Sequence, residues 1–277
     1  MIVNRQPRFQ TSARALSQSQ MLSYKTFAGD QSREWVVFVH GAGGSSAVWF
    51  KQLRDFKERF NILLVDLRGH GRSSEYHGDG RKYTLSAISQ DIVDVLEHEG
   101  IDSAHFVGVS LGTILIRMIV DIAPGKVQSV IYAGAVAGFT LSARSLISIG
   151  QALKFIVPFK TLYATFAWII MPGKQAQESR KVFRQEARRV APEEFRRWVN
   201  LIPEVRKHLK QWSTRISECP SLYLMGGKDY MFLPPARLAV SQAENSYLEV
   251  IEDVGHVCNI ERPSDFNSVA IAFLNRH

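Results

Sequence analysis

Cysteine is scarce in this chain of 277 residues, which contains only Cys219 and Cys258. The two residues form no CxxC pair and are too few for a disulfide framework or a cysteine-based metal site. The sequence therefore predicts no structural zinc and no disulfide scaffold. A reducing compartment fits this composition best, and we expect a cytoplasmic protein.

A long uninterrupted apolar run is also missing. The longest apolar region, residues 145–171, is broken by Lys154, Pro158 and Lys160, whereas a membrane-spanning helix needs about 20 predominantly apolar residues. It predicts two short helices. The first 20 residues lack the continuous apolar stretch of a secretory signal. They contain Arg and Ser but no acidic residue, which weakly resembles a transit peptide. Loose alternation of hydrophobic residues favours instead an opening β-hairpin, with strands near residues 8–14 and 21–27.

Acidic residues are unevenly distributed. Residues 139–212 contain 14 Lys and Arg but only 5 Asp and Glu, whereas the rest of the chain contains 20 Lys and Arg and 21 Asp and Glu. The whole chain carries a net charge of +8. The simplest interpretation of this basic segment is a charged face exposed to solvent. Attraction of an anionic substrate and weak contact with acidic membrane lipids are the alternatives. No nucleic-acid-binding motif accompanies the charge, so no nucleic-acid partner is expected.

Apolar runs that end in glycine or polar turns alternate with helical patterns along the rest of the chain. The predicted strands are residues 35–41, 61–71, 105–110, 127–135, 221–229 and 246–256, and the predicted helices are residues 49–59, 84–99, 111–122 and 263–275. Such alternation predicts an α/β fold in which helices flank a parallel sheet. With the opening hairpin, the sheet would have eight strands and be mostly parallel, with an antiparallel N-terminal hairpin strand.

The alternation stops between residues 139 and 212, where only helical patterns occur. We therefore predict a core domain of residues 1–138 and 213–277, with an all-helical cap of residues 139–212 inserted after the sixth strand. One half of this segment is apolar and could either face a binding site or form the segment's own core. Its apolar residues are Phe155, Phe159, Leu162, Tyr163, Phe166, Trp168 and Ile169.

The stretch HFVGVSLGT places Ser110 between Gly108 and Gly112, after an apolar strand and before an apolar helix. A GxSxG motif in this context is typical of a nucleophile elbow. Side chains two residues before and after the serine would collide with the adjoining strand and helix. The start of the helix would direct N–H groups toward negative charge that forms beside the serine.

A nucleophilic serine needs a base. His256 follows the last predicted strand, and the chemistry of open parallel sheets gathers at the carboxyl ends of the strands. His40 and His70 also end strands, but both precede Ser110 and lie in glycine-rich turns. We therefore predict His256 as the base and interpret His40 as a brace for its loop.

The base in turn needs a carboxylate. Asp229 ends the strand before His256, in a turn where Gly226 and Gly227 would allow a tight bend. Asp253 is the alternative, but it lies three residues from His256 and the loop would have to fold back on itself. The sequence favours Asp229. Glu261 is interpreted as a cap of the last helix.

The order serine, acid, histidine is one known arrangement of this triad. Together with HGAGGSSAVW at residues 40–49 and DLRGHGRS at residues 66–73, it resembles the α/β-hydrolase family over nearly the whole chain. The resemblance implies an oxyanion hole made by the backbone N–H groups of Ala42 and Leu111, and a lid role for residues 139–212.

These features predict a cofactor-free and metal-free serine hydrolase with Ser110, Asp229 and His256 as the triad. The expected substrate is a small molecule with a carboxylic ester and a hydrophobic acyl group. Thioester, lactone or C–C bond hydrolysis and perhydrolysis are alternatives, as is a non-catalytic ligand-binding or signalling protein. Serine at the elbow argues against haloalkane dehalogenase or epoxide hydrolase chemistry, since those relatives carry aspartate there.

Overall fold

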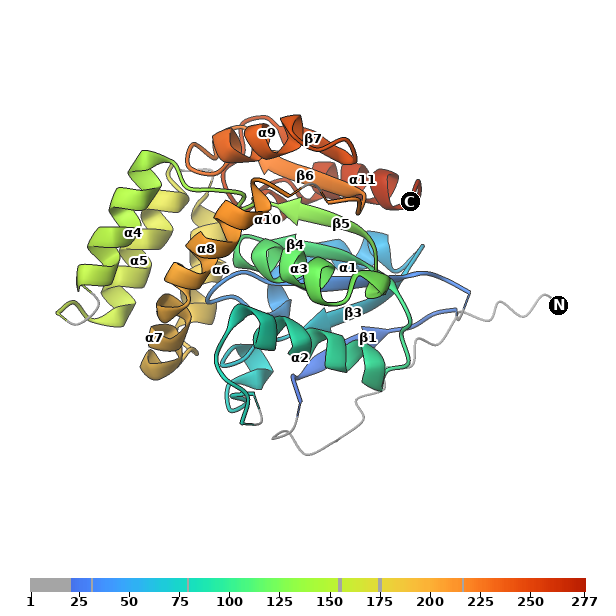
Figure 1. The fold of residues 1–277 in the computed structure, drawn as a ribbon, viewed down its shortest axis with the longest axis horizontal. Helices are drawn as coiled ribbons and strands as arrows, with labels where there is room; N and C mark the ends of the chain where they lie inside the picture. The colour runs from blue at the N-terminus through green and yellow to red at the C-terminus, as the bar shows by residue number, and fades with distance from the viewer. Residues whose placement is uncertain (1–20, 31, 79, 154–155, 174–175, 216) are drawn as a thin grey trace.

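The computed structural model describes residues 21–277 except 31, 79, 154–155, 174–175 and 216, and shows an α/β fold with one mixed sheet flanked by helices (Figure 1). The seven strands, in the sheet order β1-β3-β2-β4-β5-β6-β7, are antiparallel only between β1 and β3. Their bounds are β1 Tyr24–Phe27, β2 Trp35–Val39, β3 Asn61–Val65, β4 Ala104–Val109, β5 Val127–Ala133, β6 Ser221–Gly226 and β7 Ser246–Ile251.

The prediction of eight strands was only partly right. The described residues form seven strands, and the strand expected near residues 8–14 lies outside them. The second arm of the expected hairpin forms β1, which pairs antiparallel with β3. The helices of residues 139–212, expected after the sixth strand, follow β5 in the described sheet.

The burial of the strand residues explains why the strands appear in the sequence as apolar runs. The strands β3 and β4 are buried at every residue, as expected where helices cover both faces of a parallel sheet. The strand β7 lies at the edge of the sheet, and its residues alternate between half-buried and exposed up to the buried Ile251. The core is thus centred on the middle strands, whose carboxyl ends carry the candidate site.

Helices connect these strands. They are α1 Phe50–Phe56, α2 Leu85–His98, α3 Leu111–Ile122, α9 Leu233–Ser241, α10 Cys258–Glu261 and α11 Pro263–Leu274. The Thr84 side chain accepts a hydrogen bond from the Ala87 N–H and begins α2, as its sequence predicts. Figure 1 shows α2 and α3 in front of the sheet, with α3 directly after the end of β4.

Five helices and no strand lie in the described part of residues 139–212, which we call the helical segment. They are α4 Leu141–Leu153, α5 Phe159–Ile170, α6 Gln177–Ala187, α7 Pro192–Asn200 and α8 Ile202–Trp212. They gather at the end of the sheet toward which the arrowheads of β5 and β6 point (Figure 1). Within the described ranges, no helix is both long and apolar enough to cross a bilayer.

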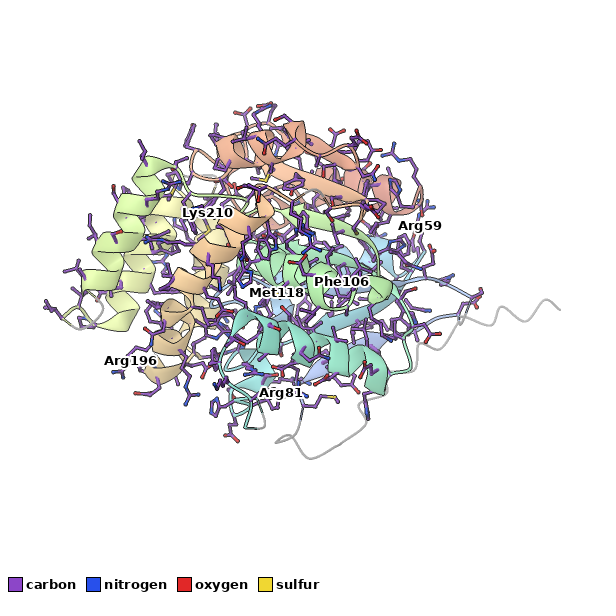
Figure 2. The ribbon with its side chains drawn as sticks, in the orientation of Figure 1. Arg59, Arg81, Phe106, Met118, Arg196 and Lys210 are labelled. Carbon is purple, nitrogen blue, oxygen red and sulfur yellow. The ribbon has the colours of Figure 1, made fainter. Side chains whose placement is uncertain are left out.

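The few carboxylates of the helical segment hold it against the rest of the chain. Lys51 Nζ pairs with Glu178 (2.8 Å), Ser45 Oγ donates to Glu186 (2.6 Å), Tyr83 OH donates to Glu194, and Leu85 N donates to Glu204 (3.0 Å). Most of the segment's described arginine and lysine side chains are exposed, as Figure 2 shows for Arg196 in contrast to the buried Phe106. Because the carboxylates contact the rest of the chain and most of the cations are exposed, the surface of the segment is basic.

Candidate active site

Ser110 occupies the turn between β4 and α3 with φ 54° and ψ −118°. Residues other than glycine rarely adopt positive φ, and such strain persists only where the surroundings impose it. Here the Ser110 N–H donates to the Ala133 carbonyl at 3.0 Å, and Thr113 Oγ1 donates to the Ser110 carbonyl at 2.6 Å. The two bonds hold the serine backbone in its strained conformation.

The glycines on either side of Ser110 are required by close contacts. A Cβ added to Gly108 would lie 2.5 Å from Ile116 Cδ1 and 2.9 Å from the backbone of Gly112 in α3. A Cβ added to Gly112 would lie 2.3 Å from the Val39 carbonyl oxygen at the end of β2. Any larger residue at either position would push α3 away from the sheet and displace the serine.

His256 and Asp229 form a buried hydrogen-bonded pair, with 2.7 Å between Nδ1 and Oδ2. The second Asp229 oxygen accepts from the Phe232 N–H at 3.2 Å. Because Nδ1 donates to the carboxylate, Nε2 carries the lone pair, and it makes no hydrogen bond within the described chain. Asp253 instead pairs with Lys228 at 2.9 Å and is 73% exposed.

Gly226 permits the contact between these two loops. A Cβ there would lie 2.0 Å from the Gly255 carbonyl oxygen and 2.5 Å from that of Val254. Its φ is not positive, so the expected tight bend is not the reason for glycine. The reason is that the loop carrying His256 passes directly against the turn carrying Asp229.

The end of β5 connects the His–Asp pair to the elbow. A Cβ on Gly134 would lie 3.1 Å from His256 Nδ1, and the preceding residue, Ala133, accepts from the Ser110 N–H. The structure thus brings the serine, the imidazole and the carboxylate to the same edge of the sheet. It records no hydrogen bond between Ser110 Oγ and His256 Nε2; such bonds are often long before substrate binds.

Two backbone N–H groups lie beside the serine. A Cβ on Gly41 would lie 3.2 Å from Ser110 Cβ and 3.9 Å from Leu111 N, so the loop carrying Ala42 rests on the elbow. Among the described residues, neither the Ala42 nor the Leu111 N–H donates to an acceptor. Both are therefore available to a developing oxyanion, and Leu111 adds the positive end of α3.

His40 and His70 hold the loops behind this site. Each ring donates through Nδ1 to a carbonyl and accepts through Nε2 from an N–H, which requires the neutral form. The bonds join His40 to Gly41 O (2.8 Å) and Leu67 N (3.0 Å), and His70 to Arg68 O (2.7 Å) and Gly43 N (2.9 Å). Burial lowers the pKa of both, that of His70 to about 3. His40 is a brace, as expected.

This buried neutral histidine predicts acid sensitivity. An unfolded chain binds a proton at His70 below its ordinary pKa of about 6.5, whereas the folded chain does not until about pH 3. The free energy of unfolding should therefore fall by about 2 kcal/mol between pH 7 and pH 5 from this residue alone. Urea unfolding at both pH values measures the fall, and His70→Gln should show a smaller one. Equal falls in both proteins would contradict the assignment.

Glu261 does not cap the last helix, contrary to the expectation. Its Oε2 accepts from the Gly255 N–H at 2.9 Å, and α11, whose N-cap residue is Arg262, has no side-chain cap. Burial raises the pKa of Glu261. Glu261 thus holds the loop that carries His256, a role that no local pattern in the sequence indicated.

Tyr163 is a further residue whose role sequence reasoning missed. Its hydroxyl, carried by α5, donates to the Ala42 carbonyl at 2.8 Å, and its ring stacks on Phe183 with centroids 4.6 Å apart. His70 accepts from the Gly43 N–H, so the peptide group between Ala42 and Gly43 is held on both sides. The sequence showed Tyr163 only as one member of an apolar helical stretch.

Comparison with known proteins agrees with this architecture. The profile of the alpha/beta hydrolase family matches residues 36–269, and the chain belongs to that family. It is 26% identical over 269 residues to 3-oxoadipate enol-lactonase 2 of Acinetobacter baylyi, covering 94% of this chain and 95% of the relative.

Solved structures share the fold. An enol-lactonase from Burkholderia xenovorans has a TM-score of 0.77 at 17% identity, covering 92% of this chain and 96% of its own. A thermophilic esterase from Thermogutta terrifontis also has a TM-score of 0.77, at 19% identity, covering 92% and 93%. Together with the family match, these findings support a hydrolase.

Proposed function

We propose that this protein is a serine hydrolase that cleaves a carboxylic ester through an acyl-enzyme intermediate. The observation that carries the proposal is the arrangement around Ser110. A strained serine lies beside two N–H groups that bond to no described residue, and the buried His256–Asp229 pair at the same sheet edge has a second ring nitrogen without a partner in the described chain. Nucleophile, base and oxyanion donors are the parts that acyl transfer requires.

In the proposed reaction Ser110 Oγ attacks the ester carbonyl while His256 Nε2 takes its proton. The N–H groups of Ala42 and Leu111 bind the oxyanion, and Asp229 stabilises the imidazolium. His256 then donates the proton to the leaving alcohol, which departs as the acyl-enzyme forms. Water activated by His256 releases the acid and restores the serine.

Lactone hydrolysis is the second candidate. A lactone is an internal ester, so the same attack opens the ring and the alcohol remains attached to the released acid. The full-length similarity to a 3-oxoadipate enol-lactonase favours this alternative. We propose that the helical segment forms a lid over either substrate, and the apolar α5 beside the Ala42 loop supports a hydrophobic acyl group.

A hydrolysis screen tests the proposal. The full chain is assayed with p-nitrophenyl esters from acetate to decanoate and with five- and six-membered lactones, and is treated with a fluorophosphonate probe. Preference for longer acyl chains supports an apolar pocket, whereas preference for lactones favours the second candidate. Absence of both hydrolysis and labelling at Ser110 would instead indicate a non-catalytic binding protein.

Tyr163→Phe tests whether the helical segment positions the oxyanion loop. The change removes the hydroxyl that holds the Ala42 carbonyl but keeps the ring on Phe183. A lost hydrogen bond of about 1 kcal/mol that acts in the transition state lowers kcat about fivefold, with little change in KM. Tyr247→Phe, at a residue 49% exposed on β7, is the matched control. Unchanged kcat with lower thermal stability would make Tyr163 purely structural.

A further inference from the structure

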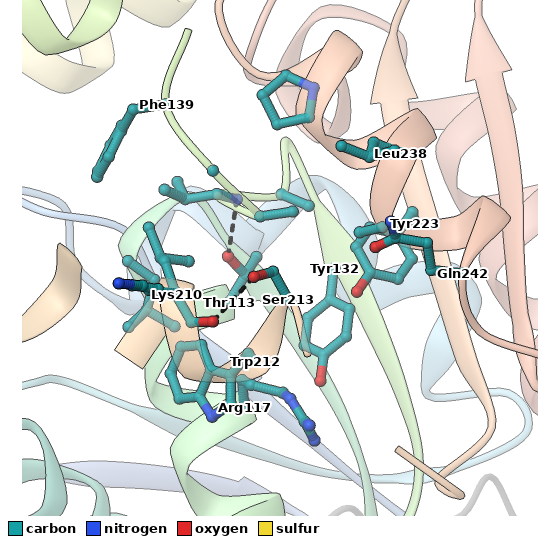
Figure 3. Close-up of a pocket in the computed structure, with 18 of the residues that line it drawn as sticks. Thr113, Arg117, Tyr132, Phe139, Lys210, Trp212, Ser213, Tyr223, Leu238 and Gln242 are labelled. Atoms are coloured by element: carbon teal, nitrogen blue, oxygen red, sulfur yellow. Dashed lines mark hydrogen bonds between the residues drawn. The ribbon is translucent and has the colours of Figure 1, made fainter. Parts of the chain in front are cut away.

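A cavity of about 1020 Å³ lies between the helical segment and the core (Figure 3). Its described lining residues come from α3, β5, α4, α8, β6, α9, the first residue of β7 and the loops beside them, and they include neither Ser110 nor His256. Thr113, which bonds the Ser110 carbonyl and the Val136 N–H, lies in the wall nearest the elbow. The cavity is thus a space distinct from the candidate active site.

The charge of this cavity is strongly one-sided. Its described lining contains no aspartate or glutamate but five cationic side chains: Arg117, Arg144, Arg206, Lys210 and Arg215. Among the described residues, the carboxylate that pairs with any of them within 4 Å is Asp121, which accepts from Trp212 Nε1 at 2.7 Å and lies 3.9 Å from Arg117 and 3.7 Å from Arg215. One carboxylate leaves most of the positive charge uncompensated, which favours an anionic ligand.

Polar groups at the inner end of the cavity are positioned to bind such an anion. The Arg117 side chain is only 12% exposed and lies over the Trp212 ring. Figure 3 shows Tyr132 between Arg117 and Tyr223. Tyr132 is 4% exposed, and neither tyrosine hydroxyl bonds to another described residue. Burial raises the pKa of Tyr132, so its hydroxyl keeps the proton that it would donate.

Much of the remaining lining is apolar. Ile114, Val136, Leu209 and Leu238 line the cavity beside the tyrosine rings. A free inorganic anion would leave these surfaces in water, whereas an apolar chain would bury them. Apolar walls around a few convergent polar groups are the usual form of a small-molecule site.

We propose that this cavity binds an organic carboxylate with an apolar chain. Arg117 and the hydroxyls of Tyr132 and Tyr223 bind the carboxylate, because a guanidinium and neutral phenols all donate to its oxygens. The chain lies along the apolar walls, and the cations nearer the opening attract the anion. The proposal is independent of the proposed hydrolysis, because it uses none of the triad.

Isothermal titration calorimetry of the full chain with decanoate and with decanol tests the proposal. Decanoate should bind at least about tenfold more tightly than decanol, and Arg117→Gln should weaken decanoate at least about tenfold. Arg196→Gln removes the same charge from an exposed position on α7 outside the cavity and should bind as wild type. Equal weakening in both variants, or equal affinity for decanol, would overturn the proposal.

Two further experiments cover the case in which Arg117→Gln fails to fold and the case in which decanoate binds at the active site. Tyr132→Phe and Tyr223→Phe each remove one hydroxyl and should weaken decanoate about threefold to fivefold even if Arg117→Gln fails to fold. His256→Ala should keep decanoate binding, since His256 does not line the cavity. Loss of binding in His256→Ala with retention in the tyrosine variants would assign decanoate to the active site. Decanoate binding without any esterase activity would contradict the proposed hydrolysis alone.

Discussion

Ser110→Ala is expected to lower kcat for the best ester substrate about a million-fold while leaving the chain folded. The hydroxyl is the only part lost, and without it the base, its carboxylate and the oxyanion donors have no nucleophile to act with; losses of about this size follow removal of a nucleophile elsewhere. The side chain makes no hydrogen bond among the described residues that its loss would break. Stability should therefore change by less than about 1 kcal/mol.

The measurement combines steady-state kinetics, fluorophosphonate labelling and urea unfolding. Ser74→Ala, at an exposed serine after the turn that follows β3, is the matched control and should retain activity and labelling. An alanine variant of Ser110 with appreciable turnover would remove the serine from the mechanism. If Ser110→Ala fails to fold, fluorophosphonate labelling of Ser110 in the wild-type chain becomes the deciding result.

Asp229→Asn is expected to lower kcat about ten-thousand-fold. An amide cannot stabilise the imidazolium, and it can donate to Nδ1 and so shift the ring proton to Nε2, which removes the base. The geometry at 2.7 Å would be nearly kept, because asparagine has the same shape. The loss should therefore appear in kcat more than in KM.

Asp253→Asn provides the matched comparison, since it makes the same change three residues from His256. Asp253 pairs with Lys228 at the surface, so its loss should change kcat less than about twofold. Steady-state kinetics on both variants with one ester decides between the two carboxylates. A larger loss from Asp253→Asn than from Asp229→Asn would reverse the assignment.

The positions of several helices were predictable, because local signals in the sequence fix where these helices begin and end. The pattern at residues 111–122 predicted α3 at those bounds, and Thr84 and Pro263 marked the starts of α2 and α11. By contrast, α9 and α10 were not predicted. The short α10 is only four residues long, too short for a helical period to show, and it is positioned by packing against the residues around it.

The sequence by itself determined the strand–helix order, the elbow around Ser110 and the histidine at the last strand, because periodicity and turn chemistry act between near neighbours along the chain. The sequence favoured Asp229 over Asp253, but only the tertiary structure showed that Asp229 contacts His256, that Glu261 holds the histidine loop and that Tyr163 reaches the Ala42 carbonyl. These contacts join distant segments or depend on the path of a loop. The same holds for the cationic cavity, since its arginines come from α3, α4, α8 and the loop after α8, and no local pattern reveals how these segments pack together.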